Sequence, residues 1–296
     1  MSKAVITGAA GFAGFSVTKE LLDRGYEVYA VLRPGSEHNE RLNGLTGDLH
    51  TLELDQTDFD RIADDIGSPC DLFFHLAWSG GRNDLEAQNS NIENSLKALE
   101  SAGKLHCRRF IGIGSQAEYG ICDIIISEDL TPDPINAYGA AKTAAMNLTK
   151  SRAEQLDIEW VWGRIFSLYG DYEPSGRMLP DLIDSLISDK DIKLSSCEQY
   201  WDYLHVRDAA KAIVLLGEKG HSGEIYNIAN GSYRPLKEYV EEAKGLFDYK
   251  GKITYGEKAD PFISLKPDIS KLTEHTSWKP EIGFSEGVLR FANEKN

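Results

Sequence analysis

The chain has 296 residues, of which 41% are hydrophobic and 27% charged, a composition typical of a globular protein and not of a disordered one. Its length suits one large or two modest domains. The formal net charge of -15 opposes broad binding to nucleic acid or to an anionic membrane, although a local cationic pocket can still hold a phosphate group.

No apolar run approaches the roughly 20 residues that a membrane-spanning helix needs, and the N-terminal MSKAVITGAAGF lacks a signal-peptide profile. We therefore expect a cytoplasmic protein. The scattered cysteines form neither a C-x-x-C pair nor a Cys/His zinc spacing, so we expect reduced thiols in or near the core and no metal site. These cysteines are Cys70, Cys107, Cys122 and Cys197.

Strand-like and helical patterns alternate along the first half of the chain. Residues 3–8 and 27–33 are β-branched and apolar, and the helical pattern between them ends at Gly25, so the chain opens with a βαβ unit. Strands that are apolar on both faces and separated by helices predict a parallel sheet covered on each side. The later strands are expected at 50–55, 71–77, 108–114 and 158–166, and the helices at 58–65, 85–102 and around Tyr138.

The pattern becomes less regular after about residue 166. Residues 169–180 are loop-like, 200–206 strand-like, and helices are expected at 181–188, 207–220 and 236–247. We predict a Rossmann-like, doubly wound α/β sheet from residues 1–165, with a contribution from about 203–228. A smaller C-terminal substrate-binding cap, residues 166–202 and 229–296, would cover the carboxyl edge of the sheet, where open α/β folds bind ligands.

The segment TGAAGFAG places Gly8, Gly11 and Gly14 at the junction of the first strand and the first helix. Glycines there permit a tight turn and close backbone approach, and the start of the helix offers N–H donors to a pyrophosphate. The spacing is G-x-x-G-x-x-G, not the commoner G-x-G-x-x-G. We expect Phe12 and Ala13 to contact a dinucleotide as well; a merely packed strand–helix turn is the alternative.

The segment NAYGAAK holds Tyr138 and Lys142 four residues apart, so on a helix their side chains share one face. A nearby ammonium favours the phenolate and lowers the pKa of a tyrosine from about 10 toward neutral pH, where the phenol can exchange protons. The alternative is a surface helix with an accidental pair.

Further motifs follow in a fixed order: HLAW after the fourth strand, GSQAEYG after the fifth, and SWKP and FSEGV near the end. Together with the glycine motif and Y-x-x-x-K, they resemble the extended short-chain dehydrogenase/reductase family, in the branch that contains nucleotide-sugar 4-epimerases, 4,6-dehydratases and 4-keto reductases. The resemblance covers nearly the whole chain. It implies that Ser115 steadies the reacting oxygen, that Tyr138 is the acid/base, and that Lys142 binds the nicotinamide ribose and lowers the tyrosine pKa.

The resemblance also implies the cofactor. Arg33 ends the second strand where NAD-preferring relatives carry an acidic residue, and a guanidinium suits a 2′-phosphate, so NADP(H) is favoured and NAD(H) stays possible. A solvated arginine is the alternative. The other implied cofactor contacts are Asp55 at the adenine, Gln56, Leu76, Ala77, Trp78, Asn91 and Ile165.

The choice of reaction depends on the segment SQAEYG. Gln116 and Ala117 stand where dehydratases carry an Asp/Glu pair, so dehydration is not expected. Glu118 matches reductase-like relatives that end in E-Y-G, or is a plain surface carboxylate. The predicted function is NADPH-dependent reduction of the 4-keto group of a nucleotide-linked deoxysugar. An NAD-dependent nucleotide-sugar 4-epimerase is one alternative, and a non-catalytic dinucleotide-sensing protein is another.

Trp201 replaces an arginine that commonly holds a substrate phosphate in the family, and it either packs in the core or stacks on a base or sugar. The missing charge could come from Arg177, Lys193 or Lys258. The resemblance further implies a homodimer joined by the helices near 85–102 and 136–155, with a nucleotide sugar as the partner and no nucleic acid or membrane. The expected substrate contacts are Trp78, Gln116, Ser167, Arg177 and Trp201.

Overall fold

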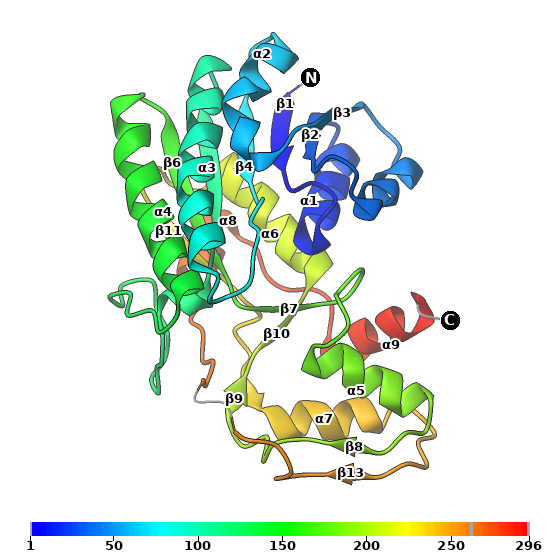
Figure 1. Cartoon of the computed structure of the whole chain (residues 1–296). Coiled ribbons are helices and arrows are strands. Elements are labelled where there is room, and N and C mark those ends of the chain that lie inside the picture. The colour runs from blue at the N-terminus through cyan, green and yellow to red at the C-terminus, as the bar shows by residue number, and fades with distance from the viewer. Residues whose placement is uncertain (1, 261–262, 295–296) are drawn as a thin grey trace.

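A seven-stranded parallel sheet forms the centre of the molecule (Figure 1). The structure is a computed structural model and describes residues 2–260 and 263–294. The strand order is β11-β6-β5-β4-β1-β2-β3. From β1 the chain adds β2 and β3 on one side of the sheet, and from β4 onward it adds strands on the other side, so the strand order reverses between β1 and β4. Open α/β sheets bind ligands outside the carboxyl ends of the strands at such a point. The strands are β1 (Lys3–Thr7), β2 (Glu27–Leu32), β3 (Leu49–Glu53), β4 (Leu72–His75), β5 (Arg109–Ser115), β6 (Glu159–Ile165) and β11 (Ile225–Ile228).

Helices cover both faces of the sheet, as expected from its apolar strands. Side chains of β1 alternate between the faces: Ile6 joins the core under α1 (Phe12–Asp23) and α6 (Val206–Lys219), and Val5 joins the core under α3 (Leu85–Lys104) and α4 (Ala137–Gln155). The fold is therefore the Rossmann-like α/β sandwich that the alternating pattern predicts.

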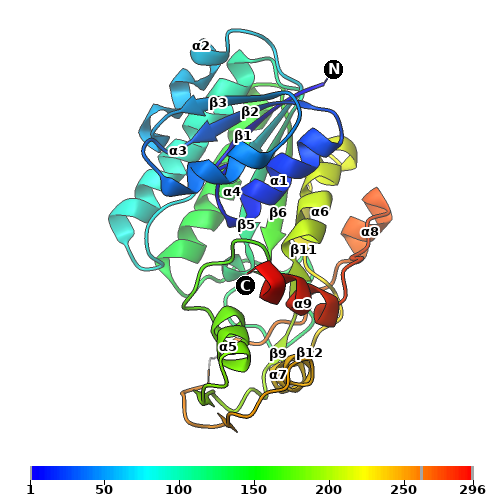
Figure 2. The same cartoon turned by 90° about the vertical axis from the view of Figure 1, so that its right-hand side faces the viewer.

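A second apolar core lies beyond the carboxyl edge of the sheet, in the lower half of Figure 2. It is built from α5 (Met178–Ile187), α7 (Leu236–Lys244) and α9 (Phe284–Glu294). Three small strand pairs accompany it, and α8 (Ser270–Thr276) packs on α6. The pairs are β7 (Ser167–Tyr169) with β10 (Tyr203–His205), β8 (Ile192–Lys193) with β13 (Ile253–Thr254), and β9 (Tyr200–Trp201) with β12 (Arg234–Pro235).

The strand expected at 200–206 is divided by Asp202. The buried carboxylate of Asp202 accepts hydrogen bonds from the backbone N–H groups of Asn230, at 2.7 Å, and Gly231, at 2.8 Å. Burial raises the pKa of Asp202 to about 6, and these bonds oppose the rise. The two halves, β9 and β10, pair with different strands, β12 and β7, so the segment is two short strands and not one.

Several helices differ from the expected ones. The helix expected at 181–188 begins at Met178, inside the segment expected to be a loop, and the helix expected at 236–247 ends at Lys244. The helix expected at 58–65 is a 3₁₀ helix, η2 (Gln56–Arg61), with a non-helical backbone at Asp58, followed by α2 (Ile62–Ile66). A further 3₁₀ helix, η1 (Glu37–Gly44), was not expected.

The cysteines are free thiols, and Cys70, Cys107 and Cys197 are buried, as the sequence predicts. Over residues 2–260 and 263–294, no helix has both the length and the apolar character that crossing a membrane requires.

Candidate active site

The turn between β1 and α1 forms a backbone cradle. Gly8 has a φ of 72°, and a Cβ there would lie 2.9 Å from the backbone nitrogen of Ala77. A Cβ on Gly14 would lie 1.9 Å from the carbonyl oxygen of Gly8, so neither position accepts a side chain. Gly11 precedes α1 and provides no side-chain cap, which leaves the first N–H groups of the helix available to an anion. The cradle thus fits the pyrophosphate of a dinucleotide.

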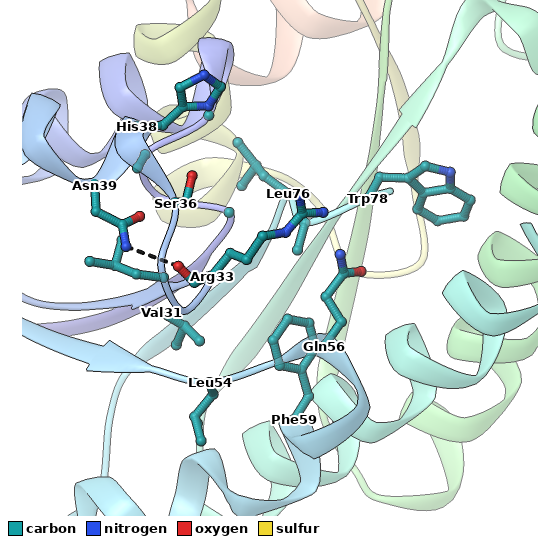
Figure 3. Close-up of a pocket in the computed structure, with 15 residues that line it drawn as sticks. Val31, Arg33, Ser36, His38, Asn39, Leu54, Gln56, Phe59, Leu76 and Trp78 are labelled. Carbon is teal, nitrogen blue, oxygen red and sulfur yellow. Dashed lines mark hydrogen bonds between the residues drawn. The ribbon is translucent and has the colours of Figure 1, made fainter. Parts of the chain in front are cut away.

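A cavity of about 240 Å³ extends from this cradle along the end of β2 (Figure 3). Its walls are apolar at Val31, Leu54 and Phe59, and polar at the opening. The Arg33 side chain reaches across the cavity. The backbone carbonyl oxygen of Arg33 accepts a hydrogen bond of 2.9 Å from the side-chain amide of Asn39. We call this cavity the β2 pocket; its other polar lining residues are Ser36, His38 and Gln56, and Leu76, Ala77 and Trp78 close its far side.

Two of the expected cofactor contacts, Asp55 and Asn91, line neither this pocket nor the larger cleft described below. The Asp55 carboxylate caps η2, accepting hydrogen bonds from the backbone N–H of Thr57, at 3.0 Å, and its hydroxyl, at 2.9 Å. These bonds, with a smaller effect of Arg33, lower the pKa of Asp55. The buried Asn91 amide holds Ser79, donating to its carbonyl oxygen at 2.8 Å and accepting from its N–H at 3.1 Å. Asn91 therefore fixes the loop after β4.

A larger cleft of about 840 Å³ adjoins the cradle and lies between the sheet and the second core. It brings together most of the residues that the sequence singles out. From the sheet side the lining includes Gly8, Gly11, Phe12, Ala13, Gly14, Leu76, Trp78, Ser115, Gln116, Tyr138, Lys142 and Ile165, and from the other side Ser167, Arg177 and Trp201.

Local hydrogen bonds fix Ser115 and Tyr138 at this cleft. Ser115 ends β5, and its Oγ accepts a hydrogen bond of 3.2 Å from the backbone N–H of Ala117. The Asn136 side chain caps α4, so Tyr138 lies in the first helical turn. The backbone N–H of Tyr138 donates to the carbonyl oxygen of Arg82 at 2.9 Å.

Lys142 is buried one turn further along α4, on the same face as Tyr138. Its ammonium donates a hydrogen bond of 2.6 Å to the carbonyl oxygen of Ile113 and lies 3.6 Å from the centroid of the Trp78 ring. The centroid of the Tyr138 ring is 6.0 Å away. Trp78 is held in turn by Gln88, whose Oε1 accepts from the indole Nε1 at 2.9 Å.

Burial has the largest effect on the pKa values of both Lys142 and Tyr138. It lowers the pKa of Lys142 to about 7, and the charge of Glu118 opposes that shift. Burial also raises the pKa of Tyr138, against smaller lowering effects of Ser115, Arg82 and Arg177. This direction is opposite to the one expected from Y-x-x-x-K, because burial outweighs the lowering effects on the phenol; the ammonium itself is directed at Ile113 and Trp78. The phenol is therefore protonated at neutral pH, as a proton donor must be.

The structure settles one alternative for Glu118 and adds one charged residue, Arg82, that the sequence did not single out. Glu118 is not a surface carboxylate: it is fully buried and paired with Arg164, with 2.7 Å between Oε2 and Nε. Arg82 lines the cleft, and its guanidinium carbon lies 5.9 Å from the centroid of the Tyr138 ring. The only sequence signal for Arg82 was its place in the loop after β4.

The three candidate phosphate-binding cations are placed differently. Arg177 lines the cleft. Lys258 lines a neighbouring cavity of about 290 Å³ in the second core, which shares Trp201 with the cleft. Lys193 lines neither and pairs with Glu257 at 3.3 Å. Within the described part of the chain, His, Cys, Asp and Glu side chains do not group in threes as metal ligands would.

Comparison with known proteins finds one matching sequence family and relatives whose names refer to nucleotide sugars. The sequence model of the NAD dependent epimerase/dehydratase family matches residues 4–229. The chain is 26% identical over 249 residues to the dTDP-6-deoxy-L-talose 4-dehydrogenase (NAD(+)) of Aggregatibacter actinomycetemcomitans, covering 80% of this chain and 88% of that one. It is 29% identical over 315 residues to the UDP-glucuronate 4-epimerase of Thermodesulfobacterium geofontis, covering 98% and 94%. The solved UDP-N-acetylglucosamine 4-epimerase from Methanobrevibacter ruminantium M1 has a TM-score of 0.88 and 25% identity, with 99% of this chain and 97% of that one covered.

Proposed function

Because the chain belongs to the NAD dependent epimerase/dehydratase family, enzymes of the extended short-chain dehydrogenase/reductase type, we propose that it acts on a nucleotide-linked deoxysugar and reduces the sugar's 4-keto group with NADPH. The observation that carries the proposal is the convergence of Ser115, Tyr138 and Lys142 on one cleft beside a backbone cradle for a dinucleotide.

The cradle of Gly8, Gly11 and Gly14 would hold the pyrophosphate, and the β2 pocket would hold the adenosine half of the cofactor. When bound, the nicotinamide supplies the hydride. Lys142 would donate to the nicotinamide ribose, exchanging its present acceptor, the carbonyl oxygen of Ile113, in part for a ribose hydroxyl.

In the reaction, negative charge develops on the substrate oxygen. The Ser115 hydroxyl donates a hydrogen bond to that oxygen, and the Tyr138 phenol delivers the proton. The raised pKa of Tyr138 suits this role, because the phenol enters the reaction protonated. Lys142 provides positive charge near the phenolate that remains.

The preference for reduction over epimerisation depends on Arg33. Its guanidinium extends into the β2 pocket toward Gln56 and Leu76, and Ser36 and Asn39 also line this pocket, so that a 2′-phosphate bound there would meet donors. A reductase must release and rebind its cofactor at each turnover, and NADPH is the usual reductant. The NAD(+) in the name of the dTDP-6-deoxy-L-talose 4-dehydrogenase favours the other cofactor, and the similarity to 4-epimerases favours an NAD-dependent 4-epimerase as second candidate.

On the substrate side, Trp78 and Gln116 would contact the sugar, and Ser167, Arg177 and Trp201 would contact the rest of the nucleotide sugar. Arg177 is the candidate for the diphosphate, because it lines the cleft and Lys193 does not. Three further predictions remain proposals: the division into a dinucleotide-binding domain and a cap, from the change of pattern after residue 166; the cytoplasmic location, from the sequence composition; and the homodimer, from the family resemblance.

A substrate panel tests the proposal. Purified protein is incubated with UDP-, dTDP-, CDP- and GDP-linked hexoses and their 4-keto-6-deoxy derivatives, with NADPH, with NADH and without added cofactor. We expect oxidation of NADPH only with a 4-keto sugar, and a product two mass units heavier. Conversion of a hexose to its C4 epimer without added cofactor would replace this function with the second candidate.

A further inference from the structure

A fully buried ion pair lies directly behind the Ser115 turn. Glu118 Oε1 accepts hydrogen bonds from the backbone N–H of Ser115, at 2.8 Å, and from the indole of Trp162, at 3.1 Å. Its other oxygen accepts from Arg164 Nε at 2.7 Å. The side chains of Glu118 and Arg164 are 0% and 1% exposed, so solvent does not screen the pair.

The surrounding residues are arranged for this pair. A Cβ at position 114 would lie 2.1 Å from Glu118 Oε1 and 2.1 Å from the Trp162 indole nitrogen, so Gly114 is required for the carboxylate to fit. The guanidinium of Arg164 packs 4.3 Å from the centroid of the Tyr119 ring. A buried ion pair is weak evidence for stability, because removing two charges from water costs about as much as their attraction returns. Its position therefore calls for another explanation.

The pair lies close to the reacting groups, because Glu118 and Lys142 bond to neighbouring backbone groups at the end of β5. Glu118 accepts from the N–H of Ser115, and the Lys142 ammonium donates to the carbonyl oxygen of Ile113, two residues earlier. At this position the negative charge of Glu118 favours the charged form of Lys142 and the neutral form of Tyr138. Both effects support the protonation states that a proton donor and its cation need. Other charged or titratable groups around the two side chains are His75 on β4, Arg164 on β6, Arg82 and Arg177.

We propose that Glu118 is a positioning residue, whose carboxylate fixes the Ser115 turn through the backbone N–H and supplies the negative charge that keeps the buried Lys142 ammonium charged. This inference rests on the proposed function, because it takes Ser115, Tyr138 and Lys142 as the reacting set. Glu118 lies behind β5, does not line the cleft, and acts through these residues.

The test is a direct titration of Lys142 in Glu118→Gln. The amide keeps an acceptor for the Ser115 N–H and removes the charge. Protein labelled with carbon-13 at lysine Cε is titrated by NMR, and the Lys142 signal is identified by its loss in Lys142→Met. Burial already lowers the pKa of Lys142 to about 7, and removing Glu118's charge should lower it further by about one unit or more.

Glu159→Gln is the matched control. Glu159 pairs with the buried Arg109 at 2.6 Å, at the other end of the same strands, where β5 and β6 begin. The Glu159→Gln substitution should lower the stability of the protein without moving the midpoint of the Lys142 titration. An unchanged midpoint in Glu118→Gln, or an equal shift in Glu159→Gln, overturns the inference.

A folding failure does not end the test. Removing one partner of a buried pair leaves an uncompensated charge, whereas removing both is often tolerated. If Glu118→Gln does not fold, the double variant Glu118→Gln/Arg164→Met is titrated instead, and a smaller downward shift is expected, because loss of the positive charge of Arg164 offsets part of the effect. No shift in the double variant contradicts the proposal.

The NMR titration needs no substrate, so it separates this inference from the proposed function. With a true 4-keto substrate, the high-pH limit of kcat in Glu118→Gln should move to lower pH, in parallel with the Lys142 midpoint, and the KM for the cofactor should change little. A shifted midpoint in a protein that reduces no 4-keto sugar supports the charge role and counts against the proposed function. A fixed midpoint with normal reduction does the reverse.

Discussion

The Lys142 ammonium lies over the face of the Trp78 ring, 3.6 Å from its centroid, while the Tyr138 ring centroid is 6.0 Å from it. A cation over a desolvated indole is stabilised by about 2 kcal/mol. The ammonium also donates a hydrogen bond to Ile113, while burial lowers the pKa of Lys142 to about 7 against the opposing charge of Glu118. Burial of this cation therefore costs stability, as is expected of a residue that we propose takes part in the chemistry.

Replacing Lys142 by methionine should raise the melting temperature. A folded pKa of about 7 against 10.5 in the unfolded chain means that the unfolded state holds more protons between those values. The free energy of unfolding therefore rises with pH between these two values. Below a pH of about 7, the buried ammonium destabilises the folded protein by its full amount. Calorimetry should show a gain of about 2–4 °C or more near pH 6 and a smaller gain near pH 9.

Lys150→Met is the matched control, because Lys150 also lies on α4, donates to a carbonyl oxygen, that of Gly223, and lies over a tryptophan ring, that of Trp160. It is less buried, and we expect no gain near pH 6. A Lys142→Met protein that melts lower than wild type at this pH would contradict our interpretation of the buried ammonium.

Tyr138→Phe should separate chemistry from binding. Without the phenol, turnover should fall by about 10²-fold or more, the range that general acid catalysis supplies, and the cofactor Kd should stay nearly constant. Stopped assays with a true substrate measure the turnover, and fluorescence titration measures the cofactor Kd. Tyr249→Phe, on a partly buried tyrosine that donates to the Lys190 carbonyl oxygen and does not line the cleft, is the control. Full turnover in Tyr138→Phe would mean that the pair in NAYGAAK is structural.

Arg33→Asp should reverse the cofactor preference. A carboxylate repels a 2′-phosphate and accepts hydrogen bonds from ribose hydroxyls, so NADPH should bind more weakly and NADH more tightly. Isothermal titration of both cofactors measures this. Arg61→Asp makes the same charge change on an exposed arginine that does not line the β2 pocket. If wild type binds NADH as tightly as NADPH, the preference for NADPH is wrong and the epimerase gains support.

No 4,6-dehydratase activity is expected. Elimination of water needs an acid and a base at the substrate, and Gln116 and Ala117 have no ionisable groups. The carboxylate of the next residue, Glu118, is buried against Arg164 and does not line the cleft. Mass spectrometry after incubation with several nucleotide-linked hexoses should detect no loss of water. A dehydrated product would show that other residues supply the acid and base.

Local chemistry explains which parts of this protein were predictable. The glycine turn and its strand–helix setting were predicted because the positive φ of Gly8 and the close approach of Gly14 to the Gly8 carbonyl oxygen are demands within a few residues. The division of the strand at Asp202 was not, since its partners, Asn230 and Gly231, lie nearly thirty residues away.

The same limit applies to the site. The helical spacing of Tyr138 and Lys142 predicted a shared face. It could not predict that Lys142 would be directed at Trp78, or that Glu118 would be buried against Arg164, 46 residues along the chain. Short elements without periodicity, such as η1 and α8, also left no clear pattern in the sequence.

Isotope transfer tests the central claim most directly. The protein is incubated with a nucleotide-linked 4-keto-6-deoxysugar and NADPH that carries deuterium on the transferred position of the nicotinamide, and the product is analysed by mass spectrometry and proton NMR. We predict that each product molecule gains one deuterium at C4 and that one NADPH is consumed for each. Interconversion of C4 epimers with no deuterium gained and no NADPH consumed would contradict the account.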